Sequence, residues 1–269
     1  MIIFIYNILM NLLIKILDMI HSLKGKAILS IMTIKKINEG SYGVIYLTNH
    51  HNLVIKIIKN NSNTTFINEV SIFYKLKDIN KKDYPSNLIK YIGFGKILDC
   101  DKNKYINCNI LFMNQYEDFY DLYPELKLVP LIFFEDYKKF IIQFIYKIVK
   151  INYFFEKKLK SVNIDIKLNN ILSDKKDIVL IDLGMLIKLD KIYINNKTHN
   201  DNWPSGKTEI KYVPNYSIGK IIYNLLFHGK RYSIELDNEI NIILKILLSR
   251  KYNTDYVYNF IQEHYSEYI

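Results

Sequence analysis

The chain has 269 residues, a formal net charge of +10, and a composition that is 49% hydrophobic and 24% charged. This length suits one large domain and leaves too little chain for a second full domain beside it, while the hydrophobic content argues against disorder over most of the length. The two cysteines, Cys100 and Cys108, have no second pair and no His at zinc-ligand spacing. They therefore argue against a zinc site and a disulfide scaffold, and they fit a reducing compartment.

The positive charge would suit an acidic protein substrate, an anionic membrane or a nucleic acid. The lysines are scattered, and no Arg-rich tract with interleaved aromatic residues is present. The densest basic cluster, Lys157–Lys160, is more typical of a solvated helix end. The sequence therefore does not favour nucleic acid, and it gives no indication of an oligomeric state.

Residues 1–20 are very apolar, and their polar residues fall on one stripe of a helix: Asn7, Asn11, Lys15 and Asp18. This spacing predicts an amphipathic helix within residues 1–31 that packs on the domain or lies on a membrane. The segment lacks the basic start and small-residue cleavage site of a secretory signal. A third reading is a mis-assigned extension, with the true start at Met19 or Met32, and the three readings stay open.

Two predicted strands flank a glycine-containing loop, Ile37-Asn38-Glu39-Gly40-Ser41-Tyr42-Gly43-Val44. Gly40 and Gly43 would let backbone N–H groups approach phosphates without a Cβ in the way. The next apolar run, Leu53–Lys56, predicts a buried strand that ends in a lysine.

A helix is predicted around Glu69, because Phe66, Val70 and Phe73 recur at helical spacing. Strands are expected near Leu88–Ile97 and at Ile110–Met113, which leads into the segment Asn114–Tyr116.

A long apolar-periodic segment, Glu135–Phe155, predicts a central helix, and further helices are expected at Asn215–Leu226, Leu236–Leu248 and Thr254–Tyr265. Between the first two of these helices lie Asp165-Ile166-Lys167-Leu168-Asn169-Asn170 and a strand, Ile178–Ile181, that runs into Asp182-Leu183-Gly184. Transfer of phosphate from ATP needs such groups: a carboxylate for the acceptor hydroxyl, a cation for the phosphoryl group, and an amide and second carboxylate for Mg²⁺.

These motifs, in this order, resemble those of eukaryotic-type Ser/Thr protein kinases. The resemblance spans about Thr33 to Leu226 and is strongest at the predicted active site. It implies an α+β, two-lobed protein-kinase-like fold over residues 32–269. The small antiparallel β lobe would span about 32–114, and a truncated, mainly helical lobe would span about 117–269. The short length and missing motifs also look like the small kinases of large DNA viruses, of the poxvirus or baculovirus type.

The resemblance assigns a role to each motif residue. Asp165 and Lys167 would be catalytic, Asn170 and Asp182 would hold Mg²⁺, and ATP would sit between the lobes. Lys56, oriented by Glu69, would bind the α- and β-phosphates. The remaining ATP-binding residues would come from the glycine loop, where Val44 would cap the adenine: Ile37, Asn38, Glu39, Gly40, Ser41, Tyr42, Gly43 and Val44.

The chain departs from the family at three places. The usual His-Arg-Asp reads Asn163-Ile164-Asp165, Asn215 replaces the Asp that begins a buried helix, and no clear Ala-Pro-Glu follows Asp182. Because Ile164 offers no cation to a phosphorylated loop, we hypothesise that activity does not depend on phosphorylation there. The paired replacement at 163 and 215 suggests a re-engineered support for the segment Asn163–Asn170, which corresponds to the family's catalytic loop.

The function expected from this resemblance is ATP- and Mg²⁺-dependent phosphorylation of Ser and Thr on proteins, with acidic proteins among the candidate substrates. The alternative is a catalytically inactive pseudokinase that acts as a binding module or decoy. A small-molecule kinase of the aminoglycoside or choline type is a further rival, but Lys167 and Asp182-Leu183-Gly184 favour a protein kinase. The expected location is the cytoplasm, that of the host if the protein is viral, with membrane association through residues 1–20 as an alternative.

Overall fold

A computed structural model describes the chain at residues 34–39, 43–49, 52–58, 63–80, 82–97, 108–190, 193–196, 203–228 and 236–269. The predicted N-terminal helix at residues 1–31 lies outside these ranges. Within them, no helix combines the length and apolar character needed to cross a membrane.

The described part of the protein is a mixed α+β structure, as the sequence predicted, and it divides into two compact units. The first unit takes its described residues from 34–73 and 90–115, and the second from 74–89 and 116–269. Each unit is considered by itself below.

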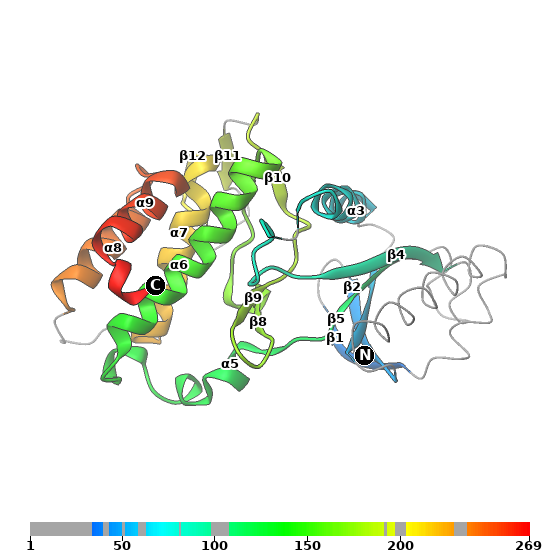
Figure 1. Ribbon diagram of the computed structural model, residues 1–269, viewed down its shortest axis with the longest axis horizontal. Helices are drawn as coiled ribbons and strands as arrows, with labels where there is room; N and C mark the ends of the chain where they lie inside the picture. The colour runs from blue at the N-terminus through cyan, green and yellow to red at the C-terminus, as the bar shows by residue number, and fades with distance from the viewer. Residues whose placement is uncertain are drawn as a thin grey trace. The chain divides into compact units, whose positions relative to one another are not determined.

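An antiparallel sheet of five strands forms most of the first unit, in the order β1-β2-β3-β5-β4. Its strands are drawn in Figure 1 and have these bounds: β1 Ile34–Glu39, β2 Gly43–Thr48, β3 Leu53–Ile58, β4 Tyr91–Ile97 and β5 Cys108–Asn114. All six residues of the central strand β3 are buried, which explains why it reads as a continuous apolar run instead of an alternating one.

The two faces of this sheet carry different side chains. One face holds an apolar cluster of alternate residues from β3 and β5, with Tyr46 and Ile92 packed against it: Leu53, Ile55, Ile57, Ile110 and Phe112. The other face carries Lys56, and helix α3 (Asn63–Lys77) covers it. Phe66 and Phe73 of α3 contact the ring of Phe94 edge-on, with centroids 6.4 and 5.7 Å away.

Four helices build the core of the second unit: α6 (Tyr137–Phe154), α7 (Val213–Phe227), α8 (Asn238–Leu248) and α9 (Thr254–His264). Helix α6 packs against α7 and α9, and α7 packs against α8, as can be followed in Figure 1. The sequence-predicted helices correspond to these four within a few residues. A short π-helical turn, Phe155–Leu159, prolongs α6 and ends at Lys160 in the left-handed conformation.

The rest of the second unit consists of short strands and short helical segments. Three small sheets form, with the orders β6-β8-β9, β7-β10 and β11-β12. Their strands are β6 Glu117–Asp118, β7 Ser161–Asn163, β8 Ile171–Ser173, β9 Ile178–Leu180, β10 Leu186–Lys188, β11 Tyr193–Asn196 and β12 Gly206–Glu209. Helical segments before α6 and α7 complete the unit: α5 Phe119–Leu122 and the 3₁₀ turns Pro124–Lys127, Leu131–Phe133, Leu168–Asn170 and Ile210–Tyr212, with a last 3₁₀ turn at Ser266–Tyr268.

The end of α3 and the segment after it differ from the sequence-based boundary, because residues 74–89 group with the second unit. Leu88 makes an isolated parallel bridge with Leu180, and the N–H of Ile89 donates to the carbonyl of Leu180 at 3.0 Å. The side chain of Asn87 also donates to the carbonyl of Ile178 at 2.8 Å. The strand expected from Leu88 consequently begins only at Tyr91.

Candidate functional site

A buried ion pair lies on the α3 side of the sheet in the first unit. Lys56 Nζ is 2.7 Å from Glu69 Oε1, and the two side chains are 8% and 1% exposed. Tyr91, at the start of β4, donates its hydroxyl to Glu69 Oε2 at 3.2 Å. The pairing predicted from sequence is thus confirmed, whereas the contribution of Tyr91 had no signal in the sequence. The pair needs both members, since a lone charge at such a site is strongly destabilising.

The register of β2 against β3 decides which glycine-loop side chains share a face with Lys56. Ile45 lies opposite Lys56, whereas Val44 lies opposite Ile57. Directly opposed residues in an antiparallel pair project to the same face, so Val44 projects away from the Lys56 face, and Val44 is 1% exposed. Val44 therefore does not share the face of Lys56, whereas Ile45, which sequence reasoning missed, does. Side chains alternate between the two faces along β2, and the pairing of β2 with β3 identifies Ile45 as the residue on the face of Lys56.

The other glycine-loop residues divide into described and undescribed positions. Ile37, Asn38 and Glu39 are exposed residues of β1. Gly40, Ser41 and Tyr42 lie outside the described residues. A Cβ at Gly43 would approach the carbonyl oxygen of Ile57 to 2.6 Å. The close approach of β3 therefore requires glycine at position 43, whether or not a ligand binds there.

In the second unit, three predicted site residues meet at the carboxylate of Asp165. Lys167 Nζ donates to both carboxylate oxygens, at 3.1 and 2.8 Å. Asn170 Nδ2 donates to Asp165 Oδ2 at 3.0 Å and to the Asp165 carbonyl at 2.8 Å. The Asp165 side chain is 11% exposed and that of Lys167 is 37% exposed, so a largely buried carboxylate is held by two donors.

A backbone contact brings the fourth predicted residue, Asp182, to this cluster. The N–H of Ile181 donates to the carbonyl of Asn170 at 2.8 Å, which places residue 182 directly after a residue bound to the loop. Asp182 has φ +57°. The left-handed conformation is uncommon for a residue other than glycine, although Asp tolerates it better than most, and such outliers concentrate at functional sites.

Asn170 and Asp182 offer donors of the kind that Mg²⁺ prefers. The Asn170 amide nitrogen is committed to Asp165, so its oxygen is the atom left to bind a cation. No group of three or more His, Cys, Asp or Glu side chains gathers within the ranges that the structure describes. Two protein oxygens fit Mg²⁺ all the same, because this ion usually keeps several waters and takes further ligands from substrate phosphates.

The interpretation of residues 163 and 215 as a paired support needs revision. The Oδ1 of Asn163 accepts from the N–H of Asp165 at 2.9 Å, so Asn163 does support the loop. The Nδ2 of Asn215, however, donates to the carbonyl of Tyr252 at 3.0 Å. Asn163 Nδ2 and Asn215 Oδ1 are both buried without a hydrogen-bond partner, so these two atoms are not bonded to each other.

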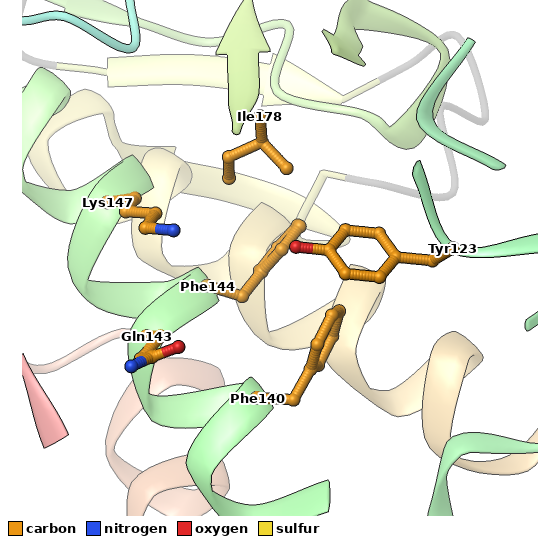
Figure 2. A pocket seen from close by; sticks show the side chains of 6 residues that line it. All are labelled: Tyr123, Phe140, Gln143, Phe144, Lys147 and Ile178. Carbon is orange, nitrogen blue, oxygen red and sulfur yellow. The ribbon is translucent and has the colours of Figure 1, made fainter. Parts of the chain in front are cut away.

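A small hollow of about 20 Å³, on the scale of one water molecule, lies beside α6. Figure 2 shows the rings of Tyr123, Phe140 and Phe144 around it, with Lys147 nearby. Burial, followed by the charges of Asp177 and Glu125, raises the pKa of Tyr123. None of the predicted site residues lines this hollow, and it is too small for an organic ligand.

The family models and the curated proteins compared with this chain gave no match. The functional argument therefore depends on the geometry of the two clusters.

Proposed function

We propose that this protein is a divergent Ser/Thr protein kinase, and that its two compact units are the two lobes of a protein-kinase-like fold. The observation that carries the proposal is the Asp165 cluster, in which one carboxylate binds both Lys167 and Asn170. Phosphoryl transfer depends mainly on positioning and charge neutralisation, and this cluster supplies groups suited to both tasks.

In the proposed reaction, the Asp165 carboxylate orients a Ser or Thr hydroxyl and accepts its proton. The hydroxyl oxygen forms a bond to the γ-phosphorus of ATP, the bond from that phosphorus to the bridging oxygen breaks, and ADP leaves. Lys167 stabilises the negative charge of the phosphoryl group during transfer. Asn170 and Asp182 would hold Mg²⁺, which when bound neutralises phosphate charge.

The first unit has the groups for the rest of ATP. The proposal assigns the α- and β-phosphates to Lys56, which Glu69 and Tyr91 hold in place. The contact with adenine that the sequence analysis gave to Val44 falls to Ile45, the residue on the Lys56 face. The family pattern supports this revision, because its apolar residue stands two positions after the last glycine.

Transfer of label from γ-labelled ATP by the full chain tests the proposal, with mixed acidic and basic proteins as acceptors. Asp165→Ala should lower turnover by about 100-fold to 10,000-fold and leave ATP binding intact. Asp83→Ala is the matched control, because it also removes a carboxylate paired with a lysine, Lys158, at 3.0 Å in the second unit. Equal labelling by wild type and Asp165→Ala would contradict the proposal.

The pseudokinase alternative has one observation in its favour. Ile164 is 1% exposed within an apolar cluster, at the place where active kinases of this type usually carry Arg. Mg²⁺-dependent ATP binding without any transfer by the wild type would support this alternative.

A further inference from the structure

We propose that Trp203 is the positioning residue that sets the orientation of the Asp165 carboxylate, and this inference rests on the proposed function. Trp203 Nε1 donates to the carbonyl of Ile164 at 2.6 Å. That carbonyl belongs to the peptide group that joins Ile164 to Asp165.

The same peptide group is held at its other end. Its N–H, that of Asp165, donates to Asn163 Oδ1 at 2.9 Å. Two side-chain bonds, from Trp203 and from Asn163, therefore fix the plane of one peptide at both ends. Since this peptide carries the Cα of Asp165, rotation of its plane would turn the carboxylate away from Lys167 and Asn170.

Trp203 is itself held by an apolar cluster. Its ring packs against a group of buried residues from β7, from the segment after it, from the 3₁₀ turn before α7 and from the start of α7: Val162, Ile164, Ile210 and Val213. Met185, Ile187 and Ile194 pack against the same group. Trp203 lies shortly before β12, which pairs with β11 through Asn196 opposite Gly206.

The hydrogen bond from Trp203 determines how the segment between Asp182 and Val213 can act on the catalytic loop. Ile164 is buried in the apolar cluster and carries no charge, so a phosphate on the segment would find no cation at that position. Trp203 instead couples the segment to the loop through a hydrogen bond and apolar contacts. Trp203 and Asn163 would then hold Asp165 in place without a modification.

The test uses Trp203→Phe in the full chain, because phenylalanine keeps an aromatic ring in the cluster and removes the N–H donor. The matched control is Tyr84→Phe, which removes another 2.6 Å bond to a backbone carbonyl, that of Ile89, in the same unit. Trp203→Phe should lower kcat by about tenfold to a hundredfold with an unchanged KM for ATP, since displaced catalytic groups affect mainly the chemical step. Tyr84→Phe should change kcat less than twofold.

A second measurement does not depend on catalysis. Amide hydrogen exchange at Asp165 should become at least about fivefold faster in Trp203→Phe and stay unchanged in Tyr84→Phe, because the peptide loses one of its two restraints. Faster exchange in a protein that transfers no phosphate would uphold the restraint by Trp203 while the proposed function fails. Unchanged exchange and unchanged kcat in an active enzyme would overturn the inference and leave the proposed function standing.

Discussion

The buried pair of Lys56 and Glu69 gives a prediction whose size can be worked out from the structure. In Lys56→Met, the apolar part of the side chain is preserved and the charge is lost. Glu69, which is 1% exposed, then loses its cationic partner and keeps the hydrogen bond from the Tyr91 hydroxyl. Leaving one charge of a buried pair without its partner costs about 3–5 kcal/mol.

The carboxyl can escape this penalty by taking up a proton. An ordinary Glu has a pKa of about 4.3, and each pH unit above it adds about 1.36 kcal/mol to the cost of the neutral form. That cost is about 3.7 kcal/mol at pH 7 and about 1 kcal/mol at pH 5. In this variant the folded state favours the protonated carboxyl, so the loss of stability grows as pH rises above 4.3 and shrinks as pH falls.

Urea denaturation followed by far-UV circular dichroism, at pH 5 and pH 7, measures both quantities. Lys56→Met should lose about 1 kcal/mol at pH 5 and about 3–4 kcal/mol at pH 7 relative to wild type. The double variant Lys56→Met/Glu69→Gln should be more stable than the single variant at pH 7, because the stranded charge is gone while Tyr91 keeps an acceptor. A loss that is the same at both pH values, or a double variant less stable than the single one, would refute the reasoning.

Three further predictions follow from other parts of the structure. Gly219→Ala should destabilise the protein by about 1–3 kcal/mol in urea denaturation, because its Cβ would lie 2.9 Å from Leu248 Cδ2 and 3.0 Å from Leu247 Cβ; a change below about 0.5 kcal/mol would contradict this packing of α7 on α8. Burial tends to raise the pKa of Asp177, but hydrogen bonds from Lys147, Asn87 and the Ile178 N–H outweigh burial and hold this pKa below its ordinary value of 3.8. The stability that Asp177 contributes is therefore present above pH 3.8 and lost as pH falls through the folded-state pKa, so the difference between wild type and Asp177→Asn should be smaller at pH 2.5 than at pH 6, and an equal difference at both values would count against it. Because Ile164 offers no cation to a phosphorylated loop, a double Thr198→Ala/Thr208→Ala variant should retain phosphotransfer within about threefold, and its abolition would reject phosphorylation-independent activity.

Much of the fold could be predicted from the sequence because its signals are local. Apolar residues at helical spacing identified α6 within a few residues of its observed ends and placed α3 around Glu69. The apolar run at Leu53–Ile55 identified a strand buried on both faces, although the strand continues past Lys56 to Ile58. Where the signal was an apolar run without pairing information, as from Leu88, the start of the strand was misjudged, because Leu88 pairs with Leu180 instead of with β5.

At the candidate site, the sequence determined the chemical inventory: a buried lysine with a helical glutamate, and Asp165, Lys167, Asn170 and Asp182 in order. Spacing alone could supply these residues because each lies within a short motif. Only the tertiary structure decided which side chains meet. Strand register put Ile45, and not Val44, on the face of Lys56. Packing across about forty residues of sequence brought Trp203 to the carbonyl of Ile164, and helix packing sent Asn215 to Tyr252. These contacts depend on how separate elements pack together, which no local pattern records.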